Sequence, residues 1–390
     1  MKGARCAIGI VLFMGILISC HKPGTPSVPT PTQNDSNQNI PVSGLTYRGL
    51  DLSYDYKIED ERGIRFYDSS GNASPLFQIC AAQGVNIIRL RLWVNPSDSD
   101  QECSLPAVKK QALKISGAGM KLWLDLHYSD TWADPGHQTL PAAWTGISYL
   151  ALLDSVYDYT YNVINQLQQQ GTPPEIVQVG NEINAGMLWP FGNVSAYADS
   201  NWTQLAAIID TAESAIKKVN SGIKVMIHFA GINGADQFYS QCDKFGIPYD
   251  LIGISFYPWW HGKDLSVLQS GLNTLTSNHA NKGILIAETA YPFTLSGVDQ
   301  ASNIVGDPSQ LISTYPASST GQLDFLVALM KTVKNVTGGG GLGVCYWEPD
   351  WVAYNGPAAT DWQNGSDWEN LALFDFNFKA LPGLQAFKSH

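Results

Sequence analysis

The sequence is poor in charged residues and has no excess of basic ones. Only 15% of its 390 residues are charged, and 23 Lys and Arg stand against 34 Asp and Glu, giving a formal net charge of −11. A nucleic-acid partner is not expected, because phosphates require a basic face. The first strand-like run ends in Gly49-Leu50-Asp51-Leu52-Ser53 without a Gly-rich phosphate turn. That absence disfavours a nucleotide-binding open sheet.

Cysteine is scarce and is never paired at metal-binding spacing. The chain has six cysteines and no C-x-x-C motif, so a zinc site is not expected. Apart from Cys6 and Cys20, the cysteines are Cys80, Cys103, Cys242 and Cys345. Export would permit disulfides, so a bridge between Cys80 and Cys103 and a set of free buried thiols both stay open.

The apolar run near the N-terminus, residues 7–18, is too short for a comfortable membrane span. Two basic residues precede it, as in a secretory signal peptide. It ends in Leu17-Ile18-Ser19-Cys20, which resembles a bacterial lipobox. We therefore predict that residues 1–19 are a lipoprotein signal peptide and that Cys20 becomes the lipidated N-terminus, with an ordinary signal peptide as the alternative. The lipid would anchor an exported protein to the leaflet of a bacterial outer membrane, with the periplasmic or surface face left open.

A flexible tether and one folded domain are expected after the signal. Residues 20–42 consist largely of Pro, Thr, Ser, Asn and Gln and cannot bury a core. The domain is expected over residues 43–390, and an apolar content of 44% is sufficient for its core. The 43 aromatic residues favour flat, uncharged ligands such as polysaccharides.

Eight short apolar runs alternate with segments of helical periodicity. The runs are residues 46–52, 85–94, 120–127, 176–180, 223–229, 251–257, 284–287 and 342–347. The helical segments include residues 75–82, 105–115, 150–169, 203–219, 235–244, 265–278 and 323–336. Nearly continuous apolar runs are typical of strands buried on both faces. The alternation predicts a single-domain (β/α)8 TIM barrel with enlarged βα loops, and a doubly wound open sheet is the competing fold.

Two carboxyls stand at the C-terminal ends of predicted strands, where a barrel carries its functional residues. Glu182 follows the fourth apolar run, and Glu288 directly follows the seventh. These strands lie on opposite sides of an eight-strand ring, so the two side chains face across it. Glycoside hydrolysis uses such a pair. The alternative is that each Glu only forms an ion pair with Arg89 or Arg91.

Longer motifs carry a resemblance to a known family. Residues 125–136, DLHYSDTWADPG, are similar to the third-strand motif of glycoside hydrolase family 53, the endo-β-1,4-galactanases. Further matching segments are residues 89–96, 180–183, 188–190 and 346–349. Asn181-Glu182 together with Glu288 resembles the signature of the retaining clan A glycosidases. The resemblance extends from about residue 45 to the C-terminus.

The resemblance implies an endo-acting, retaining hydrolase of β-1,4-galactosidic bonds in the (arabino)galactan side chains of pectin. Glu182 resembles the acid/base and Glu288 the nucleophile, and Asn181 is expected to bond the sugar 2-OH. Arg89 and Tyr257 resemble groups that bond the nucleophile and keep it ionised. The other expected substrate-binding residues are His127, Asp130, Trp132, Trp189, His228 and Trp347, the last as the aromatic floor.

Alternatives remain open for several of these residues and for the function. Asp130 is alternatively a loop cap, and Trp132 and Trp189 are alternatively loop packing. Retention predicts carboxyls about 5–5.5 Å apart and a raised pKa for Glu182. The functional alternatives are a clan A glycosidase of β-mannan or β-glucan specificity and a non-catalytic, lipid-anchored glycan-binding protein. We expect a monomer.

The chemistry requires no cofactor, but a structural calcium ion is an open possibility. Some family members hold calcium between the loops after strands seven and eight. The corresponding candidates here are Asp299, Asn303, Ser366 and Glu369. Gly297 and Ala301 stand where a metal-binding version carries further ligands. Calcium takes six to eight oxygens, and four candidates are few.

Overall fold

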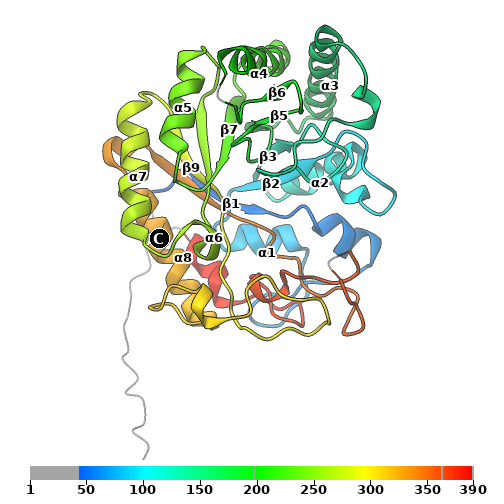
Figure 1. Cartoon of the computed structure of the whole chain (residues 1–390). Coiled ribbons are helices and arrows are strands. Elements are labelled where there is room, and N and C mark those ends of the chain that lie inside the picture. The colour runs from blue at the N-terminus through cyan, green and yellow to red at the C-terminus, as the bar shows by residue number, and fades with distance from the viewer. Residues whose placement is uncertain (1–43, 197, 362, 389–390) are drawn as a thin grey trace, which may run out of the picture. The chain divides into compact units, whose positions relative to one another are not determined.

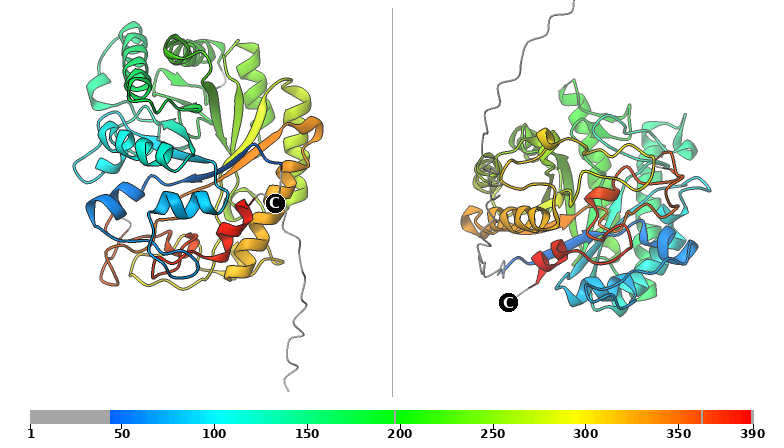
Figure 2. Two further views of the ribbon diagram at one scale, coloured as in Figure 1. Left: turned by 180° about the vertical axis from the view of Figure 1, so that it is seen from behind. Right: turned by 90° about the horizontal axis from the view of Figure 1, so that it is seen from below.

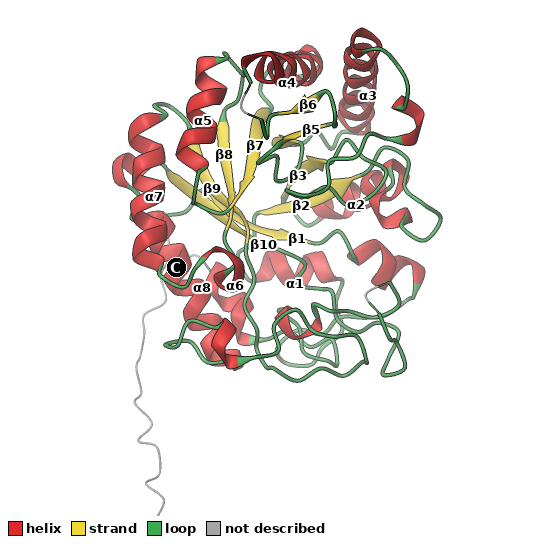
Figure 3. Ribbon diagram, viewed as in Figure 1, coloured by secondary structure: helices red, strands yellow, loops and turns green. Residues whose placement is uncertain are grey.

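A closed barrel of eight parallel strands forms the centre of the folded domain (Figures 1 and 3). The computed structural model describes residues 44–196, 198–361 and 363–388; the predicted signal peptide, lipidation site and tether lie outside the described residues. The barrel strands are β1 (Tyr47–Asp51), β2 (Ile87–Leu92), β3 (Lys121–Leu126), β4 (Ile176–Val179), β7 (Lys224–Ala230), β8 (Leu251–Ser255), β9 (Gly283–Glu288) and β10 (Gly341–Tyr346). The predicted (β/α)8 barrel is confirmed.

Helices surround the barrel in the order expected for strand–helix units (Figure 2). They are α1 (Leu76–Ala82), α2 (Leu105–Gly117), α3 (Tyr149–Gln170), α4 (Asp199–Val219), α5 (Ala235–Lys244), α6 (Pro258–His261), α7 (Leu265–Asn278) and α8 (Ser319–Lys334). Of these, only the single turn α6 was not predicted. The two short strands β5 (Gly186–Met187) and β6 (Gly192–Asn193) pair with each other in the loop after β4.

Local capping chemistry sets several helix ends. Ser148 caps α3 by accepting a hydrogen bond from Ala151 N, and Gly171 ends that helix with a left-handed φ of 84°. Helices α4 and α8 begin four residues before their predicted starts, at Asp199 and Ser319. In α8 the cause is Ser318, whose side chain accepts from Gly321 N over 3.0 Å.

An apolar layer fills the inside of the barrel below its C-terminal end. Its members come from all eight strands: Tyr47, Ile87, Trp123, Ile176, Met226, Leu251, Leu285, Ala287 and Cys345. Because alternate residues of a strand share a face, the next inward positions on β2, β3, β4 and β7 hold Arg89, Asp125, Gln178 and His228. All four are buried. The barrel therefore has an apolar plug covered by a polar layer.

The described cysteines Cys80, Cys103, Cys242 and Cys345 are all buried and free, so the open bridge between Cys80 and Cys103 is not formed. Among the helices that the structure describes, none is long and apolar enough to cross a membrane.

Candidate active site

A cavity of about 570 Å³ opens at the C-terminal ends of the barrel strands. Six Trp and Tyr side chains line it: Trp132, Tyr257, Trp260, Trp347, Trp351 and Trp368. Four acidic side chains line it as well: Asp134, Glu182, Glu288 and Asp367. Aromatic faces beside carboxyls suit a neutral, hydroxyl-rich ligand that stacks on flat side chains.

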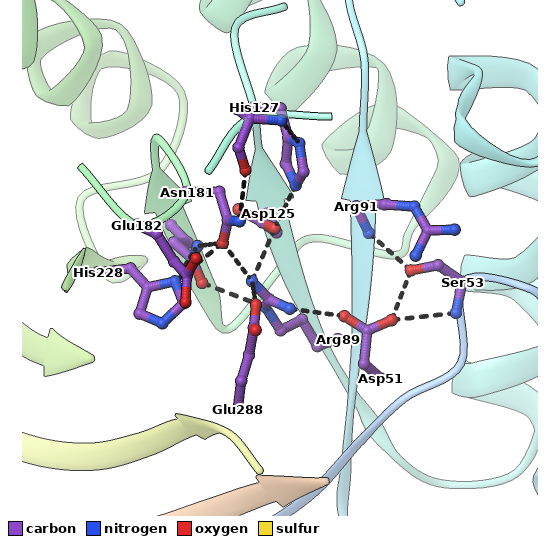
Figure 4. Close-up of polar contacts among 12 residues, drawn as sticks. Asp51, Ser53, Arg89, Arg91, Asp125, His127, Asn181, Glu182, His228 and Glu288 are labelled. Carbon is purple, nitrogen blue, oxygen red and sulfur yellow. Dashed lines mark hydrogen bonds and ion pairs between the residues drawn. The ribbon is translucent and has the colours of Figure 1, made fainter. Parts of the chain in front are cut away.

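Arg89 on β2 connects the polar groups beneath this cavity (Figure 4). Its Nη1 lies 2.7 Å from Asp51 Oδ2, and its Nη2 lies 2.8 Å from Asp125 Oδ2 and 2.9 Å from Glu288 Oε1. The same Nη2 donates to Asn181 Oδ1 over 2.9 Å. One buried cation is therefore shared by three carboxylates, which leaves the cluster short of positive charge.

Glu288, the last residue of β9, lies at the centre of the cluster. Arg89 contacts its Oε1, and the Tyr257 hydroxyl donates to its Oε2 over 3.0 Å. Burial raises the pKa of Glu288 to about 8; Arg89 opposes this shift, whereas the nearby charge of Glu182 adds to it. The expected contacts are present: Arg89 favours the Glu288 anion as predicted, and burial raises the pKa against it.

Glu182 follows β4 in a sharp turn, with a left-handed φ of 46°. For a residue other than glycine this conformation is strained, and such strain gathers at functional sites. Its Oε1 accepts a hydrogen bond from Ser255 Oγ over 2.5 Å. Burial raises the pKa of Glu182 to about 7, with Ser255 and Arg89 opposing the shift. The direction agrees with the prediction.

Glu182 and Glu288 act electrostatically on one another and titrate as a pair. When the pair holds one proton, the anion belongs on Glu288, because Arg89 and the Tyr257 hydroxyl both stabilise it there. Glu182 has only the Ser255 hydroxyl as a hydrogen-bond partner among the described residues. The half-ionised pair thus presents one carboxylate and one carboxylic acid to the same cavity.

Tryptophans form one wall of the cavity. Trp347, directly after β10, meets Trp368 edge-on with ring centroids 4.6 Å apart and lies 6.0 Å from Trp132. The Arg91 guanidinium lies 4.3 Å from the Trp132 ring centroid and forms an ion pair with Glu348. Trp132 therefore lines the cavity and is also held by a cation–π contact.

Other predicted site residues line the cavity or support it from behind. His127 and Asn181 line it; His127 is held by Asp125, 2.9 Å from its Nε2. Asp130, Trp189 and His228 are absent from the lining. Asp130 accepts hydrogen bonds from Asn95 N and Ala142 N, which matches the loop-cap alternative.

Trp189 and His228 contact protein groups instead of the cavity. Trp189 Nε1 donates to Ala185 O over 3.1 Å, which matches the loop-packing alternative. His228 is fully buried in the polar layer, 2.8 Å from Ser255 Oγ. Neither side chain lines the cavity, so their contact with a ligand stays a prediction.

Sequence reasoning missed four residues of the polar cluster: Asp51, Asp125, Gln178 and Ser255. Asp51 pairs with Arg89, Gln178 Oε1 accepts from Arg89 Nε over 3.2 Å, and Ser255 bonds Glu182. Two-residue spacing was the available signal: Gln178 follows the plug residue Ile176 by two positions on the same strand.

The four calcium candidates come together, but most of their side-chain oxygens already form hydrogen bonds. Asp299 accepts from Ala301 N and Ser366 N, and Glu369 Oε1 accepts from Val298 N over 2.7 Å. Ser366 Oγ donates to a backbone carbonyl. Among the described residues, no group of three or more His, Cys, Asp or Glu is arranged to hold a metal.

Gly297 gives the physical reason for this arrangement. A Cβ at that position would lie 2.4 Å from Glu369 Oε1, so the carboxylate occupies the space that a ligand side chain would need. Among the side-chain oxygens of the four candidates, Asn303 Oδ1 and Glu369 Oε2 are buried without partners. These residues do not fit a calcium ion, which takes six to eight oxygens.

Comparison with known proteins agrees with this geometry. The profile of glycosyl hydrolase family 53 matches residues 47–387. An arabinogalactan endo-β-1,4-galactanase of Cellvibrio japonicus is 38% identical over 362 residues, covering 91% of this chain and 93% of that protein. The endo-β-1,4-galactanase of Bacillus subtilis is 30% identical over 378 residues, covering 87% of this chain and 85% of that protein.

Solved structures are similar over most of the chain. The GH53 catalytic domain of Ignisphaera aggregans has a TM-score of 0.81 at 38% identity, with 90% of this chain and 97% of that chain covered. A fungal β-1,4-galactanase structure has a TM-score of 0.75 at 34% identity, with 88% and 99% covered.

Proposed function

The chain belongs to glycosyl hydrolase family 53, and from that premise we propose that it is a retaining endo-β-1,4-galactanase acting on the (arabino)galactan side chains of pectin. The observation that carries the proposal is the carboxyl pair Glu182 and Glu288 in one aromatic cavity, with Arg89 and Tyr257 on Glu288. The named galactanases among its relatives support the substrate.

In the first step the carboxyl pair breaks the glycosidic bond. Glu182 donates its proton to the glycosidic oxygen while a Glu288 oxygen attacks the anomeric carbon. The bond from that carbon to the leaving sugar breaks, and a covalent galactosyl ester forms on Glu288. The geometry suits this step because Arg89 and Tyr257 favour the Glu288 anion.

In the second step water releases the product. Glu182, now a carboxylate, takes a proton from a water molecule whose oxygen attacks the anomeric carbon, and the ester bond to Glu288 breaks. The two inversions leave the configuration of the anomeric carbon unchanged. This double displacement requires the two carboxyl groups to lie about 5–5.5 Å apart. Asn181 would bond the sugar 2-OH, and Trp347 would stack beneath the sugar at the cleavage point.

Reducing-end release tests the proposal. We expect rapid release of short oligosaccharides from unsubstituted β-1,4-galactan and none from β-mannan or cellulose, with Glu288→Gln as the inactive control. Proton NMR of the first product should show the β-anomer. If β-mannan or cellulose were cleaved faster than galactan, that polymer and not galactan would be the substrate. Binding of galactan without release from any polymer would support a glycan-binding protein instead.

We also propose that the protein is an exported monomer, lipidated on Cys20 and anchored to the outer membrane. The support is the sequence alone: a basic start, a short apolar run and Leu-Ile-Ser-Cys before a polar tether. Incorporation of an alkyne fatty acid in a bacterial host should label the wild-type chain and not Cys20→Ser. Equal labelling of the wild-type chain and the variant would refute Cys20 as the lipidation site. Light scattering of the purified protein tests whether it is a monomer.

A further inference from the structure

A serine and a histidine below the cavity connect Glu182 to the polar layer of the barrel. Ser255, the last residue of β8, donates to Glu182 Oε1 over 2.5 Å. The Nε2 of His228, on β7, lies 2.8 Å from Ser255 Oγ. Both side chains are fully buried. Figure 4 shows His228 beside Glu182 and Asn181.

We propose that Ser255 and His228 are positioning residues that decide which oxygen of Glu182 carries the catalytic proton. Ser255 gives its single hydrogen to Oε1, so the proton for the leaving sugar is held on Oε2. That oxygen forms no hydrogen bond within the described residues, and Glu182 lines the cavity. The inference rests on the proposed function, because the acid role of Glu182 is part of it.

Counting hydrogens fixes the direction of these bonds. A hydroxyl has one hydrogen, and an ionised carboxylate only accepts. With Glu182 ionised, the Ser255 hydrogen therefore points to Oε1. The Ser255 oxygen can then accept from His228, which requires the hydrogen of that imidazole to be on Nε2.

On its other side, the imidazole has both an acceptor and a donor within hydrogen-bond distance of Nδ1. His228 Nδ1 lies 2.9 Å from Asn181 Oδ1 and 3.1 Å from Gln178 Nε2. Asn181 Oδ1 also lies 2.9 Å from Arg89 Nη2 and 3.0 Å from Gln178 Nε2, and these two donors fill its two lone pairs. The Gln178 amide has two hydrogens and also lies 3.1 Å from Gly180 O. In the proposed tautomer it donates one hydrogen to His228 Nδ1 and shares the other between Asn181 Oδ1 and Gly180 O. With the hydrogen on Nδ1, the ring would donate to Asn181 Oδ1 instead.

His228 stays neutral in these surroundings. Burial, followed by the charge of Arg89, lowers its pKa well below 6.5. The charged and titratable groups facing Glu182 and His228 are Arg89, Asp125, His127, Asp134, Tyr257, His261 and Glu288. With the opposite tautomer, Ser255 would donate to Nε2, and a protonated Glu182 would turn its hydrogen to Ser255 and away from the sugar.

Histidine NMR tests the tautomer directly and needs no substrate. In protein labelled with ¹⁵N-histidine, the signal lost in His228→Gln identifies this residue among seven histidines. We expect its shifts to be those of a neutral ring protonated at Nε2 from pH 5 to 8. A ring protonated at Nδ1, or a charged ring, would overturn the proposal.

The pH profile of Ser255→Ala tests the effect on Glu182. The hydrogen bond from Ser255 stabilises the carboxylate, so its loss should raise the pKa of Glu182 and move the alkaline limb of kcat/KM to higher pH by about one unit. Ser255→Thr keeps the hydroxyl and should restore the limb. Ser129→Ala, another buried serine without a contact to Glu182, is the matched control.

An unchanged alkaline limb in an active Ser255→Ala enzyme would overturn the positioning role, whatever happens to kcat. Failure of the wild-type protein to cleave galactan would instead refute the proposed function and leave the tautomer measurement intact. If Ser255→Ala does not fold, Ser255→Cys and the wild-type NMR spectrum still decide the question.

Discussion

The two carboxyls at the centre of the site have different surroundings, so replacing each should give a different kinetic result. Glu288→Gln removes the nucleophile, and we expect kcat on galactan to fall by about 10⁴-fold or more with binding retained. Glu182→Gln should lose about 10²–10⁴-fold on galactan. On an aryl galactoside, whose leaving group needs no proton, the rate of the first step should fall much less in this variant. Equal losses on both substrates would contradict the acid role.

The pH dependence of cleavage follows from the same pair. Glu182 must hold its proton when the sugar leaves, and its pKa is about 7. We expect kcat/KM to fall as the pH rises above about 7 and also in acid, where the carboxyl pair takes up its second proton. Asp134 raises the pKa of Glu182 through its charge. Asp134→Asn should therefore move the alkaline limb to lower pH, and a shift to higher pH would be inconsistent with this account.

Residue chemistry decides what the sequence can predict at this scale. Glu182 and Glu288 were identifiable because a carboxyl at the end of a buried apolar run is costly to desolvate and is seldom placed there without a role. Ser255 was not, because a serine at a strand end is compatible with many roles and its partner after β4 is 73 positions away. The sharing of Arg89 could not be predicted for a similar reason, because its three carboxylates come from three different strands.

At the scale of the elements, the loop after β3 allows a test of whether Asp130 caps the loop or contacts the sugar directly. Asp130 accepts from Asn95 N and Ala142 N over 2.9 Å and 2.8 Å, and the same loop carries Trp132 into the cavity. Asp130→Ala should lower the free energy of unfolding by about 1–2 kcal/mol and raise KM more than it lowers kcat. Urea denaturation and steady-state kinetics measure both. Unchanged stability with a raised KM would favour a direct contact with the sugar.

Strands and helices were predictable, whereas the long loops were not. The strand positions follow from apolar runs that must be buried on both faces, and every predicted run overlaps a barrel strand. Helices α4 and α8 start earlier than their apolar periodicity indicates, because their first turns are polar; in α8 the Ser318 side chain also caps the first turn. The arrangement of Asp299 and Glu369 could not be predicted from the sequence, because it joins loops about 70 residues apart through hydrogen bonds from backbone N–H groups.

At the scale of the whole molecule, buried acids should make the fold less stable in alkali. Burial raises the pKa values of several carboxyls: to about 6 for Asp367, about 7 for Glu182 and Glu369, and about 8 for Glu288 and Glu348. Unfolded carboxyls titrate near 4. Between the two values the folded protein keeps protons that the unfolded chain has lost, so stability declines as the pH rises through the folded values.

We therefore expect Tm to fall by several degrees between pH 5 and pH 8.5, measured by calorimetry on the full chain. The net charge of −11 acts in the same direction through self-repulsion. Because salt screens exposed charges far more than buried ones, the decline should persist in 0.5 M NaCl. Glu288→Gln removes one titrating group, so its decline should be shallower. A Tm that rises with pH over this range would show that the buried carboxyls are already ionised in the folded protein.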